Sequence, residues 1–390
     1  MQTSKYVIVG AGLTADSACK AIRERDRDGT ILVVGDEPHP PYLRPPLSKG
    51  LWKGTQEDTV WRGTEELGVE LRLGRRVVAL DIAARAVTDD AGEQHGYERL
   101  LLATGGRARQ LPFDDEGVIY FRTLDDYRRL RSLAVSGVRV CVIGGGFIGS
   151  EIAAALALND CRVTMVFPEA GIGARLFPVE LSAALNEYYR NRDVEVLPQA
   201  TVAGIERSGR RSRVQLGDGR TIDADVVVAG IGITPNLELA ADAGLPVANG
   251  ILVDAYGQIG GREELFAAGD VARFPLSALA SEVRVEHEDH AKSHGRQVGA
   301  NMAGARTRYD HLPFFYSDLF DVGYEAVGDL DVRLDTLIDW SEPEGEGTIT
   351  YLDRERRPRG LLLWNRFGHL DAARELIRAG EPLAESVQVG

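Results

Sequence analysis

The sequence predicts an α/β fold made of two similar βαβ units and a smaller α+β domain towards its C-terminal end. Two glycine-rich turns each follow an apolar, β-branched run and precede an Ala-rich stretch, which is the order strand, turn, helix. Two later apolar runs, residues 99–103 and 225–229, also end in glycine-containing turns. After about residue 306 the chain changes to short alternating stretches and a final helix, which indicates a separate domain.

Composition limits the classes of protein that this chain can be. Its 390 residues suffice for two or three domains, and the net charge of −14 argues against non-specific nucleic-acid binding. No apolar run approaches the roughly 18 residues of a membrane span. The chain also starts with strand residues rather than a signal peptide, so we expect a cytoplasmic location. Cys19, Cys141 and Cys161 form no Cys-x-x-Cys pair, and we expect them to be small buried residues.

The first unit is expected to contain a strand, a turn with a helix, and a second strand, over residues 6–10, 11–27 and 30–35. Prolines in the stretch 38–46 forbid regular structure there. A meander of short strands is expected next, at residues 69–73, 76–81 and 85–88, followed by the strand at 99–103.

The second unit is expected to start at Val138, with a helix through Leu158 and a strand over 161–167. A further helix and three strands are expected at residues 178–190, 194–197, 202–206 and 213–216. Another helix begins near His287, and the last domain should hold strands and a helix at 348–352, 360–365 and 371–378. The predicted domains are thus 1–111 with 233–305, 112–232, and 306–390.

The first glycine turn has the residues that a dinucleotide needs. Gly10 permits the tight turn, Gly12 lets the backbone approach a pyrophosphate, and Ala15 allows close packing of helix on strand. The helix N-terminus supplies N–H groups and a positive dipole end for the phosphates. Asp36 or Glu37, at the end of the second strand, would accept the ribose hydroxyls.

The second turn has all three glycines, Gly144, Gly146 and Gly149. Glu169 closes its second strand, where a carboxylate accepts both hydroxyls of an NADH ribose and repels a 2′-phosphate. Arg175 would partly offset that repulsion, so we expect NADH with NADPH tolerated. Two nucleotide sites on one chain predict two Rossmann-like units, in an oxidoreductase that moves electrons between two cofactors.

Several runs add a family resemblance. The run Pro41-Tyr-Leu-Arg-Pro-Pro-Leu-Ser-Lys49 resembles the signature of the FAD-dependent, ferredoxin-reductase-like branch of the pyridine nucleotide oxidoreductases. Within that branch, residues 167–169, 285–290 and 316–328 are most similar to apoptosis-inducing factor and its bacterial relatives. The resemblance covers nearly the full length. It implies that the two Rossmann-like units are of the glutathione-reductase type, with FAD in the first and NADH in the second. It also implies a C-terminal α+β domain of the reductase or dimerisation type that closes over the flavin.

The resemblance also implies roles for single residues. Asp36 and Arg44 would hold the adenosine ribose of FAD, and Lys49 would lie near the flavin N5 edge, paired with Glu151. A lysine beside N5 stabilises charge on reduced flavin, and a carboxylate keeps it oriented and protonated. In the structural alternative, Lys49 is a surface residue and Glu151 an acid favoured by the helix dipole. Phe147 would lie over the flavin ring, or simply pack.

The remaining expected site residues come from the C-terminal half. Asp270 would bond the flavin ribityl chain, and the helix after Val285 would direct its N-terminus at the flavin C2 carbonyl. His287 and Tyr316 would bracket the ring. His287, His290 and His294 recur at helical spacing, as metal ligands do, but no matching ligand set is evident and no metal is expected.

The predicted residues are collected here. The expected catalytic residues are Lys49, Phe147, Glu151, His287 and Tyr316. The expected cofactor-binding residues are Gly10, Gly12, Ala15, Asp36, Glu37, Arg44, Lys49, Ala103, Thr104, Gly105, Gly144, Gly146, Phe147, Ile148, Gly149, Glu169, Arg175, Gly232, Gly269, Asp270, Glu286 and His287.

Two functional hypotheses follow. The first is an FAD-dependent NAD(P)H oxidoreductase that passes hydride from NADH to flavin and electrons on to a separate acceptor. That acceptor would be a ferredoxin- or rubredoxin-type protein, a quinone or oxygen, since the cysteine spacing disfavours disulfide reduction. The alternative is a slow NADH oxidase that acts mainly as a redox-sensing, partner-binding flavoprotein similar to apoptosis-inducing factor. Either is expected to be a monomer or a homodimer.

Overall fold

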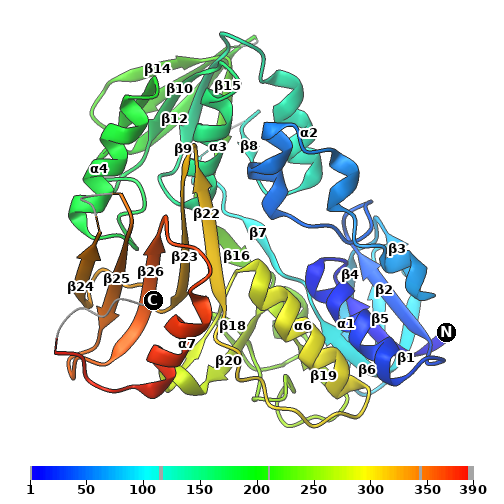
Figure 1. The fold of residues 1–390 in the computed structure, drawn as a ribbon. Helices are drawn as coiled ribbons and strands as arrows, with labels where there is room; N and C mark the ends of the chain where they lie inside the picture. The colour runs from blue at the N-terminus through cyan, green and yellow to red at the C-terminus, as the bar shows by residue number, and fades with distance from the viewer. Residues whose placement is uncertain (1, 114–116, 210, 342–344, 385–390) are drawn as a thin grey trace. The chain divides into compact units, whose positions relative to one another are not determined.

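The computed structural model describes residues 2–113, 117–209, 211–341 and 345–384 (Figure 1). The chain divides into two compact units. Unit 1 contains Met1–Leu43, Asp58–Arg107 and Thr234–Phe314, and unit 2 contains Arg44–Glu57, Ala108–Ile233 and Phe315–Gly390. The short segment 44–57, expected in the first domain, thus belongs to unit 2. The three-domain division remains a prediction.

Unit 1 is built on a seven-stranded sheet in the order β3-β2-β1-β6-β5-β4, with β19 also pairing with β6. Its strands are β1 (Gln2–Val9), β2 (Ile31–Gly35), β3 (Glu70–Leu73), β4 (Val77–Asp81), β5 (Ala86–Asp89), β6 (Gln94–Leu102) and β19 (Leu265–Ala267). The expectation that β3 belongs to the meander is wrong. It pairs parallel to β2, with Leu32 opposite Glu70, because the long connection after β2 allows the crossover that parallel strands need.

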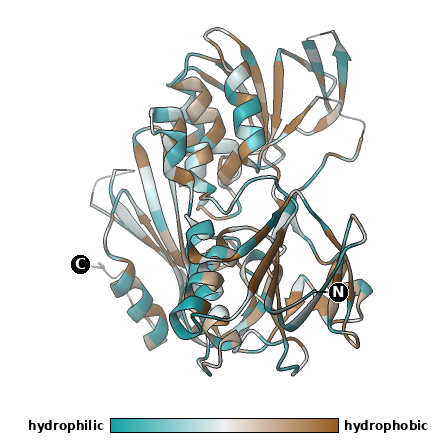
Figure 2. Ribbon diagram, turned by 90° about the vertical axis from the view of Figure 1, so that its right-hand side faces the viewer, coloured by the Kyte–Doolittle hydropathy of each residue, from teal (hydrophilic) through white to brown (hydrophobic). Residues whose placement is uncertain are grey.

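Two helices lie side by side in unit 1 (Figure 1): α1 (Leu13–Arg25) and α6 (Glu288–Met302). Glycines on α6 permit the close approach, since a Cβ added at Gly295 would lie 2.5 Å from the carbonyl oxygen of Thr14. Apolar strands of the sheet, which are brown in Figure 2, pack with these helices into one core.

The rest of unit 1 is a smaller sheet and short helices. The sheet has the order β17-β18-β20-β21. Its strands are β17 (Val247–Ala248), β18 (Gly250–Leu252), β20 (Ala272–Leu276) and β21 (Ser281–Val283). The short helix α5 (Glu238–Asp242) contacts β4 of the large sheet. The 3-10 helices of the chain are η1 (Pro45–Ser48), η2 (Gly50–Lys53), η3 (Glu57–Val60), η4 (Thr64–Leu67), η5 (Gly269–Val271) and η6 (Ser277–Leu279). Two further strands, β7 (Gly106–Ala108) and β16 (Ile233–Pro235), pair with each other.

Unit 2 contains a parallel sheet in the order β11-β10-β9-β15-β8 and an antiparallel sheet, β12-β13-β14. The strands are β8 (Ile119–Tyr120), β9 (Arg139–Ile143), β10 (Arg162–Val166), β11 (Val194–Leu197), β12 (Val202–Ser208), β13 (Arg211–Leu216), β14 (Thr221–Ala224) and β15 (Val226–Ala229). The helices are α2 (Leu124–Leu133), α3 (Phe147–Ala157) and α4 (Val179–Arg190). Helix α2 was not predicted, although Thr123 and Asp126 form a capping box at its start.

The C-terminal part of unit 2 is an antiparallel sheet in the order β22-β23-β26-β25-β24, followed by a helix. Its elements are β22 (Phe314–Leu319), β23 (Val322–Gly328), β24 (Asp335–Trp340), β25 (Gly347–Leu352), β26 (Pro358–Trp364) and α7 (Leu370–Ala379). The two strands and the helix that were predicted here agree with β25, β26 and α7 to within two residues. Within the described part of the chain, no helix is long and apolar enough to cross a membrane.

Candidate cofactor sites

The turn between β1 and α1 forms a cradle in unit 1. Gly10 has φ +109°, and a Cβ there would lie 2.2 Å from the carbonyl oxygen of Ala103, so only glycine fits. A Cβ on Gly12 would meet nothing within 4 Å, and no side chain caps α1 at this residue. An open glycine beside an uncapped helix N-terminus suits the phosphates of a dinucleotide. Ala15 is fully buried against the strand, as close packing requires.

The acidic residues expected to contact ribose follow β2. Asp36 is largely exposed and forms an ion pair with Arg76, Nη2 to Oδ2 2.9 Å. Glu37 accepts a 2.5 Å hydrogen bond from the Tyr42 hydroxyl. Arg76 was missed by the sequence reasoning because it lies 40 residues further along the chain than Asp36.

Loops that are distant in sequence meet the first cradle. Gly269 has φ +74°, and a Cβ there would lie 2.2 Å from Thr14 Oγ1, in the first turn of α1. The predicted ribityl ligand, Asp270, therefore follows a residue packed on the cradle. Thr104 donates a 3.0 Å hydrogen bond from Oγ1 to the Asn236 carbonyl. Asn236 returns a 2.8 Å bond from Nδ2 to the Thr104 carbonyl. This exchange fixes the turn of Ala103, Thr104 and Gly105.

The start of α6 is uncapped by any side chain and has His287 at its N-cap. Protein around the imidazole lowers the pKa of His287 to about 4 through desolvation. A pKa of about 4 leaves the imidazole uncharged at neutral pH, and the helix dipole and N–H groups supply positive potential at this end of α6. Glu286 pairs with Arg284 at 2.6 Å, Nη1 to Oε1.

The other two histidines of α6 belong to an aromatic cluster. His290 stacks on Phe274 with ring centroids 4.7 Å apart, and His294 stacks on Tyr309 at 4.5 Å. Burial lowers the pKa of His290 and brings that of His294 to about 3. Both rings are therefore uncharged components of the core.

Among the described residues, one group has metal-ligand spacing: Asp89, Glu93 and His95, in the hairpin between β5 and β6. The sequence reasoning did not select it. Asp89 Oδ1 already accepts backbone N–H bonds from Ala91 and Glu93 at 3.0 and 2.9 Å. That geometry is sufficient to explain the buried aspartate as a turn-forming residue.

The turn between β9 and α3 repeats the cradle in unit 2. Gly144 has φ +119°, and a Cβ there would lie 2.4 Å from the Gly230 carbonyl oxygen. Gly146 is the uncapped N-cap of α3 and has open space beside it. A Cβ on Gly149 would lie 2.0 Å from the Gly144 carbonyl oxygen, so the third glycine is required for packing. The predicted Ile148 lies within this turn of α3, and Gly232 has φ +94° in the loop after β15.

Glu169, three residues after β10, is engaged by Arg175. The Nε and Nη2 atoms of Arg175 lie 2.8 and 2.6 Å from Glu169 Oε1. The arginine side chain is 78% exposed and the glutamate 24%. This arrangement places a partly neutralised carboxylate beyond the end of the strand, where a coenzyme ribose lies in this type of fold.

The expected pair of Lys49 and Glu151 is formed in unit 2, with Nζ 2.7 Å from Oε2. The Glu151 side chain is 3% exposed and that of Lys49 only 11%, which argues against the alternative of a surface lysine. The Tyr316 ring lies under Nζ, 5.3 Å from its centroid. Ser48 donates a 2.5 Å hydrogen bond to Oε2 and Ser317 a 2.6 Å bond to Oε1. These two serines were missed, since nothing in the sequence links them to a glutamate 103 or 166 residues away.

Two more predicted residues lie near this pair in the chain. The Phe147 ring, at the start of α3, meets Phe315 edge to face with centroids 5.1 Å apart. Arg44 donates a 2.9 Å hydrogen bond from Nη1 to the Arg122 carbonyl.

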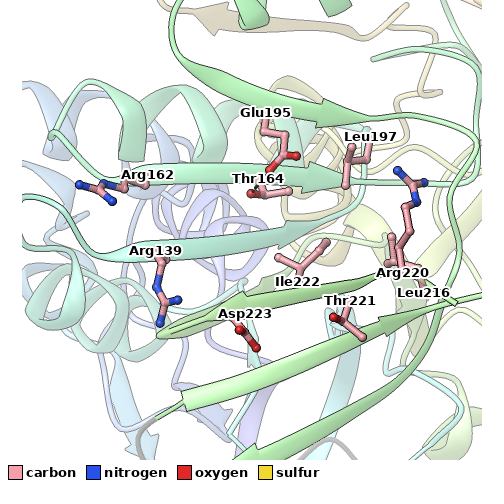
Figure 3. Close-up of a pocket in the computed structure, with 10 residues that line it drawn as sticks. All are labelled: Arg139, Arg162, Thr164, Glu195, Leu197, Leu216, Arg220, Thr221, Ile222 and Asp223. Carbon is pink, nitrogen blue, oxygen red and sulfur yellow. Dashed lines mark hydrogen bonds between the residues drawn. The ribbon is translucent and has the colours of Figure 1, made fainter.

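The structure also has a cavity of about 400 Å³ in unit 2, lined from β9, β10, β11, β13 and β14 (Figure 3). Arg139 and Arg162, on its wall, are the first residues of β9 and β10, whereas the glycine turn follows the other end of β9. The cavity contains none of the predicted residues and is distinct from the coenzyme cradle.

Comparison with known proteins places this chain among flavoprotein reductases. Residues 4–295 match the family described as pyridine nucleotide-disulphide oxidoreductase. Residues 298–346 match the C-terminal domain of mitochondrion-associated apoptosis-inducing factor.

Individual relatives cover almost the whole chain. The ferredoxin–NAD(+) reductase component of the anthranilate 1,2-dioxygenase system of Burkholderia cepacia is 36% identical over 97% of this chain and 95% of its own. Mitochondrial apoptosis-inducing factor 1 of Dictyostelium discoideum is 34% identical over 96% of this chain and 78% of its own. Putidaredoxin reductase, solved in its covalent complex with putidaredoxin, superposes on this chain with a TM-score of 0.91 at 30% identity. The match covers 98% of this chain and 95% of that structure.

The two glycine cradles, each beside an uncapped helix N-terminus, fit the FAD and NAD(P)H that this family uses. The chain belongs to the pyridine nucleotide-disulphide oxidoreductase family, as an FAD-dependent NAD(P)H oxidoreductase of the ferredoxin-reductase-like type.

Proposed function

We propose that this protein takes electrons from NADH through FAD and delivers them to a small ferredoxin-type iron–sulfur protein. The observation that carries the proposal is the pair of cradles on a chain without a thiol pair. All three cysteines are free and buried, so electrons leave from the flavin itself. Burial raises the pKa of the Cys19 and Cys141 thiols to about 12, which makes both unreactive. The relation to a ferredoxin–NAD(+) reductase supports the acceptor class.

We further propose that the first cradle, with Asp36, binds FAD and the second, with Glu169, binds the coenzyme. The domain division 1–111 with 233–305, 112–232 and 306–390 accompanies this assignment, and separate sheets support it. NADH is preferred because Glu169 repels a 2′-phosphate, and Arg175 reduces that repulsion without removing it. The buried, unpaired thiols also support a cytoplasmic location.

The bound flavin supplies the hydride and one-electron chemistry, and the chain supplies its binding and electrostatics. Lys49 contributes one positive charge in a buried setting, where charges act more strongly than in water. Glu151 fixes the ammonium group of that lysine in place through their 2.7 Å contact. The Tyr316 ring covers one side of the ammonium group, 5.3 Å from Nζ to the ring centroid.

The alternative is a slow oxidase that senses redox state and binds a partner. The match of residues 298–346 to the C-terminal domain of apoptosis-inducing factor favours it. The two functions differ in what happens after the flavin has been reduced.

Acceptor turnover tests the proposal. Purified holoprotein is reduced anaerobically with NADH and then mixed with a plant-type or adrenodoxin-type ferredoxin, rubredoxin, a quinone or oxygen. Rapid multiple turnover with a ferredoxin supports the reductase. Slow reoxidation by all four supports the sensor, and rapid turnover with quinone alone replaces the proposed acceptor.

A further inference from the structure

The carboxylate of Glu151 joins three stretches of the chain within unit 2, its own helix and two others. Glu151 itself lies on α3 and is 3% exposed. Ser48, at the end of η1, donates to Oε2, and Ser317, on β22, donates to Oε1. Lys49 Nζ contacts Oε2 as well. Both carboxylate oxygens therefore have a hydroxyl donor, and the lysine is one partner of three.

A buried ion pair needs such additional donors. Taking two charges out of water costs several kcal/mol per ion, on the order of what their attraction returns, unless further hydrogen bonds satisfy the remaining lone pairs. A carboxylate offers about four acceptor positions, and one ammonium group cannot fill them. Hydroxyl groups fill them without adding charge, so the Lys49–Glu151 pair stays neutral overall.

We infer that Ser48 and Ser317 are positioning residues for flavin reduction, which act by fixing Glu151 and, through it, the ammonium group of Lys49. The inference rests on the proposed function, because Lys49 acts there on the flavin. It assigns to the C-terminal sheet, through Ser317, a part in the reduction step itself.

The strand that carries Ser317 is itself anchored. It is the edge strand of the C-terminal sheet and pairs there with β23. In the turn after β22, Asp321 accepts hydrogen bonds from Tyr188 and Arg192 of the α4 region, the latter at 2.7 Å. The Arg192 guanidinium also lies 3.6 Å from the centroid of the Tyr188 ring. These contacts restrict the movement of β22 against α4.

The segment that carries Lys49 is attached to the same turn. Lys53 Nζ donates a 3.3 Å hydrogen bond to the Phe320 carbonyl. The segment of Lys49 and the strand of Ser317 are therefore also joined by this bond, which does not involve Glu151. Loss of one hydroxyl should loosen the ammonium group without unfolding the unit.

The test uses holoprotein variants Ser317→Ala and Ser48→Ala, with Ser317→Thr as the variant that keeps the hydroxyl. Ser182→Ala is the matched control, because Ser182 is equally buried in unit 2 and donates to the Ile172 carbonyl instead. The rate of flavin reduction by NADH is measured anaerobically by stopped flow. We expect about a tenfold loss for each alanine variant, with KM for NADH within twofold, and substantial recovery in Ser317→Thr.

A double-mutant cycle shows whether the hydroxyl acts through the lysine. In a Lys49→Met background, Ser317→Ala should lower the reduction rate by less than twofold further. A second cycle, Ser317→Ala with Glu151→Leu, is read by thermal unfolding without NADH. There the shifts in Tm should be less than additive, since both variants remove the same bond.

Three outcomes would overturn the inference. They are alanine variants that behave like Ser182→Ala, an undiminished tenfold effect in the Lys49→Met background, or additive shifts in Tm. If the wild-type flavin is not reduced by NADH at all, the proposed function fails and the reduction role of the serines fails with it. The unfolding cycle then still decides whether Ser317 holds Glu151.

Discussion

Units 1 and 2 repeat one glycine cradle, but they compensate a buried carboxylate near it in different ways. In unit 1, Asp16 on α1 is fully buried and contacts two cations, Lys20 at 2.9 Å and Arg62 at 3.1 Å. Thr64 adds a hydroxyl donor to it at 2.8 Å. In unit 2, Glu151 on α3 has a single cation and two hydroxyls.

This difference in partners indicates a structural role for the Asp16 cluster and a chemical role for the Glu151 cluster. The Asp16 cluster joins α1 to the chain around η4 with more positive than negative charge, and the cations remain partly in water. The Glu151 cluster is drier: its one cation is only 11% exposed. We interpret the Asp16 cluster as one that stabilises the fold, and the Glu151 cluster as one that positions the Lys49 charge for the flavin.

The largest expected effect is on stability in unit 1. Asp16→Asn should lower the free energy of unfolding by about 3 kcal/mol, the lower end for a broken buried ion pair, because Lys20 and Arg62 keep contact with water. Urea unfolding measures it. The rate of flavin reduction per bound FAD should be within twofold of wild type, and a selective loss of that rate would remove the contrast between the clusters.

Next comes the chemical effect in unit 2. Lys49→Met should slow flavin reduction by NADH about 10²-fold, as for the loss of one electrostatic stabiliser of the transition state. FAD content, measured by absorbance, should remain near one per chain. Lys49→Arg, which keeps the charge, should recover part of the rate. An unchanged rate in Lys49→Met would take Lys49 out of the mechanism.

Acid sensitivity should come from the neutral histidines of unit 1. His294 has its pKa lowered from 6.5 to about 3 by burial, so the unfolded chain binds a proton that the folded chain refuses. Stability is complete above pH 6.5 and falls as the pH drops from there towards 3. Between pH 6.5 and 5, the free energy of unfolding should fall by about 2 kcal/mol less in His294→Gln than in wild type, as measured by denaturant unfolding at each pH. Parallel curves for the two proteins would contradict this.

Removing the carboxylate of each cradle should weaken the binding of a different nucleotide. Glu169→Ala should raise KM for NADH about tenfold with kcat little changed, because a charge-assisted bond to ribose is lost. Asp36→Ala, its counterpart in unit 1, should instead lower the FAD content. If Glu169→Ala weakened FAD and not NADH, the assignment of the cradles would be reversed.

The smallest effect is expected at a cysteine. Cys161 donates weakly from Sγ to the Val135 carbonyl at 3.7 Å, and serine can replace that bond. Cys161→Ser should change acceptor turnover by less than twofold in a steady-state assay. A large loss would point to thiol chemistry that the structure does not explain.

Local signals explain what could be predicted. The cradles were recognisable because a strand, spaced glycines and a helix stand together in the sequence, and the structure gives Gly10 and Gly144 the positive φ that such turns need. The partnership of Lys49 and Glu151 came from resemblance, and their ion pair is present. The capping box of Thr123 and Asp126 was visible in the sequence and was overlooked.

Other features depend on chain paths that no local pattern encodes. Serine is common, and no local pattern distinguishes Ser48 or Ser317 from the other serines. Only the fold brings these two residues to one carboxylate. The parallel pairing of β3 depends on a crossover rather than on its own residues. Likewise, the attachment of residues 44–57 to unit 2 follows from contacts of η1 and η2 with α2 and α3. Just after α3, Asn159 Nδ2 also donates a 3.2 Å hydrogen bond to the Trp52 carbonyl.

The central claim is that one chain holds FAD and receives electrons from NADH at a separate site. Anaerobic titration of the purified protein with NADH, followed by flavin absorbance, tests it most directly. We predict one FAD per chain, complete bleaching by one equivalent of NADH, and restoration of the oxidised spectrum on adding oxidised ferredoxin. A protein that contains no flavin, or whose flavin stays oxidised in excess NADH, would contradict the account.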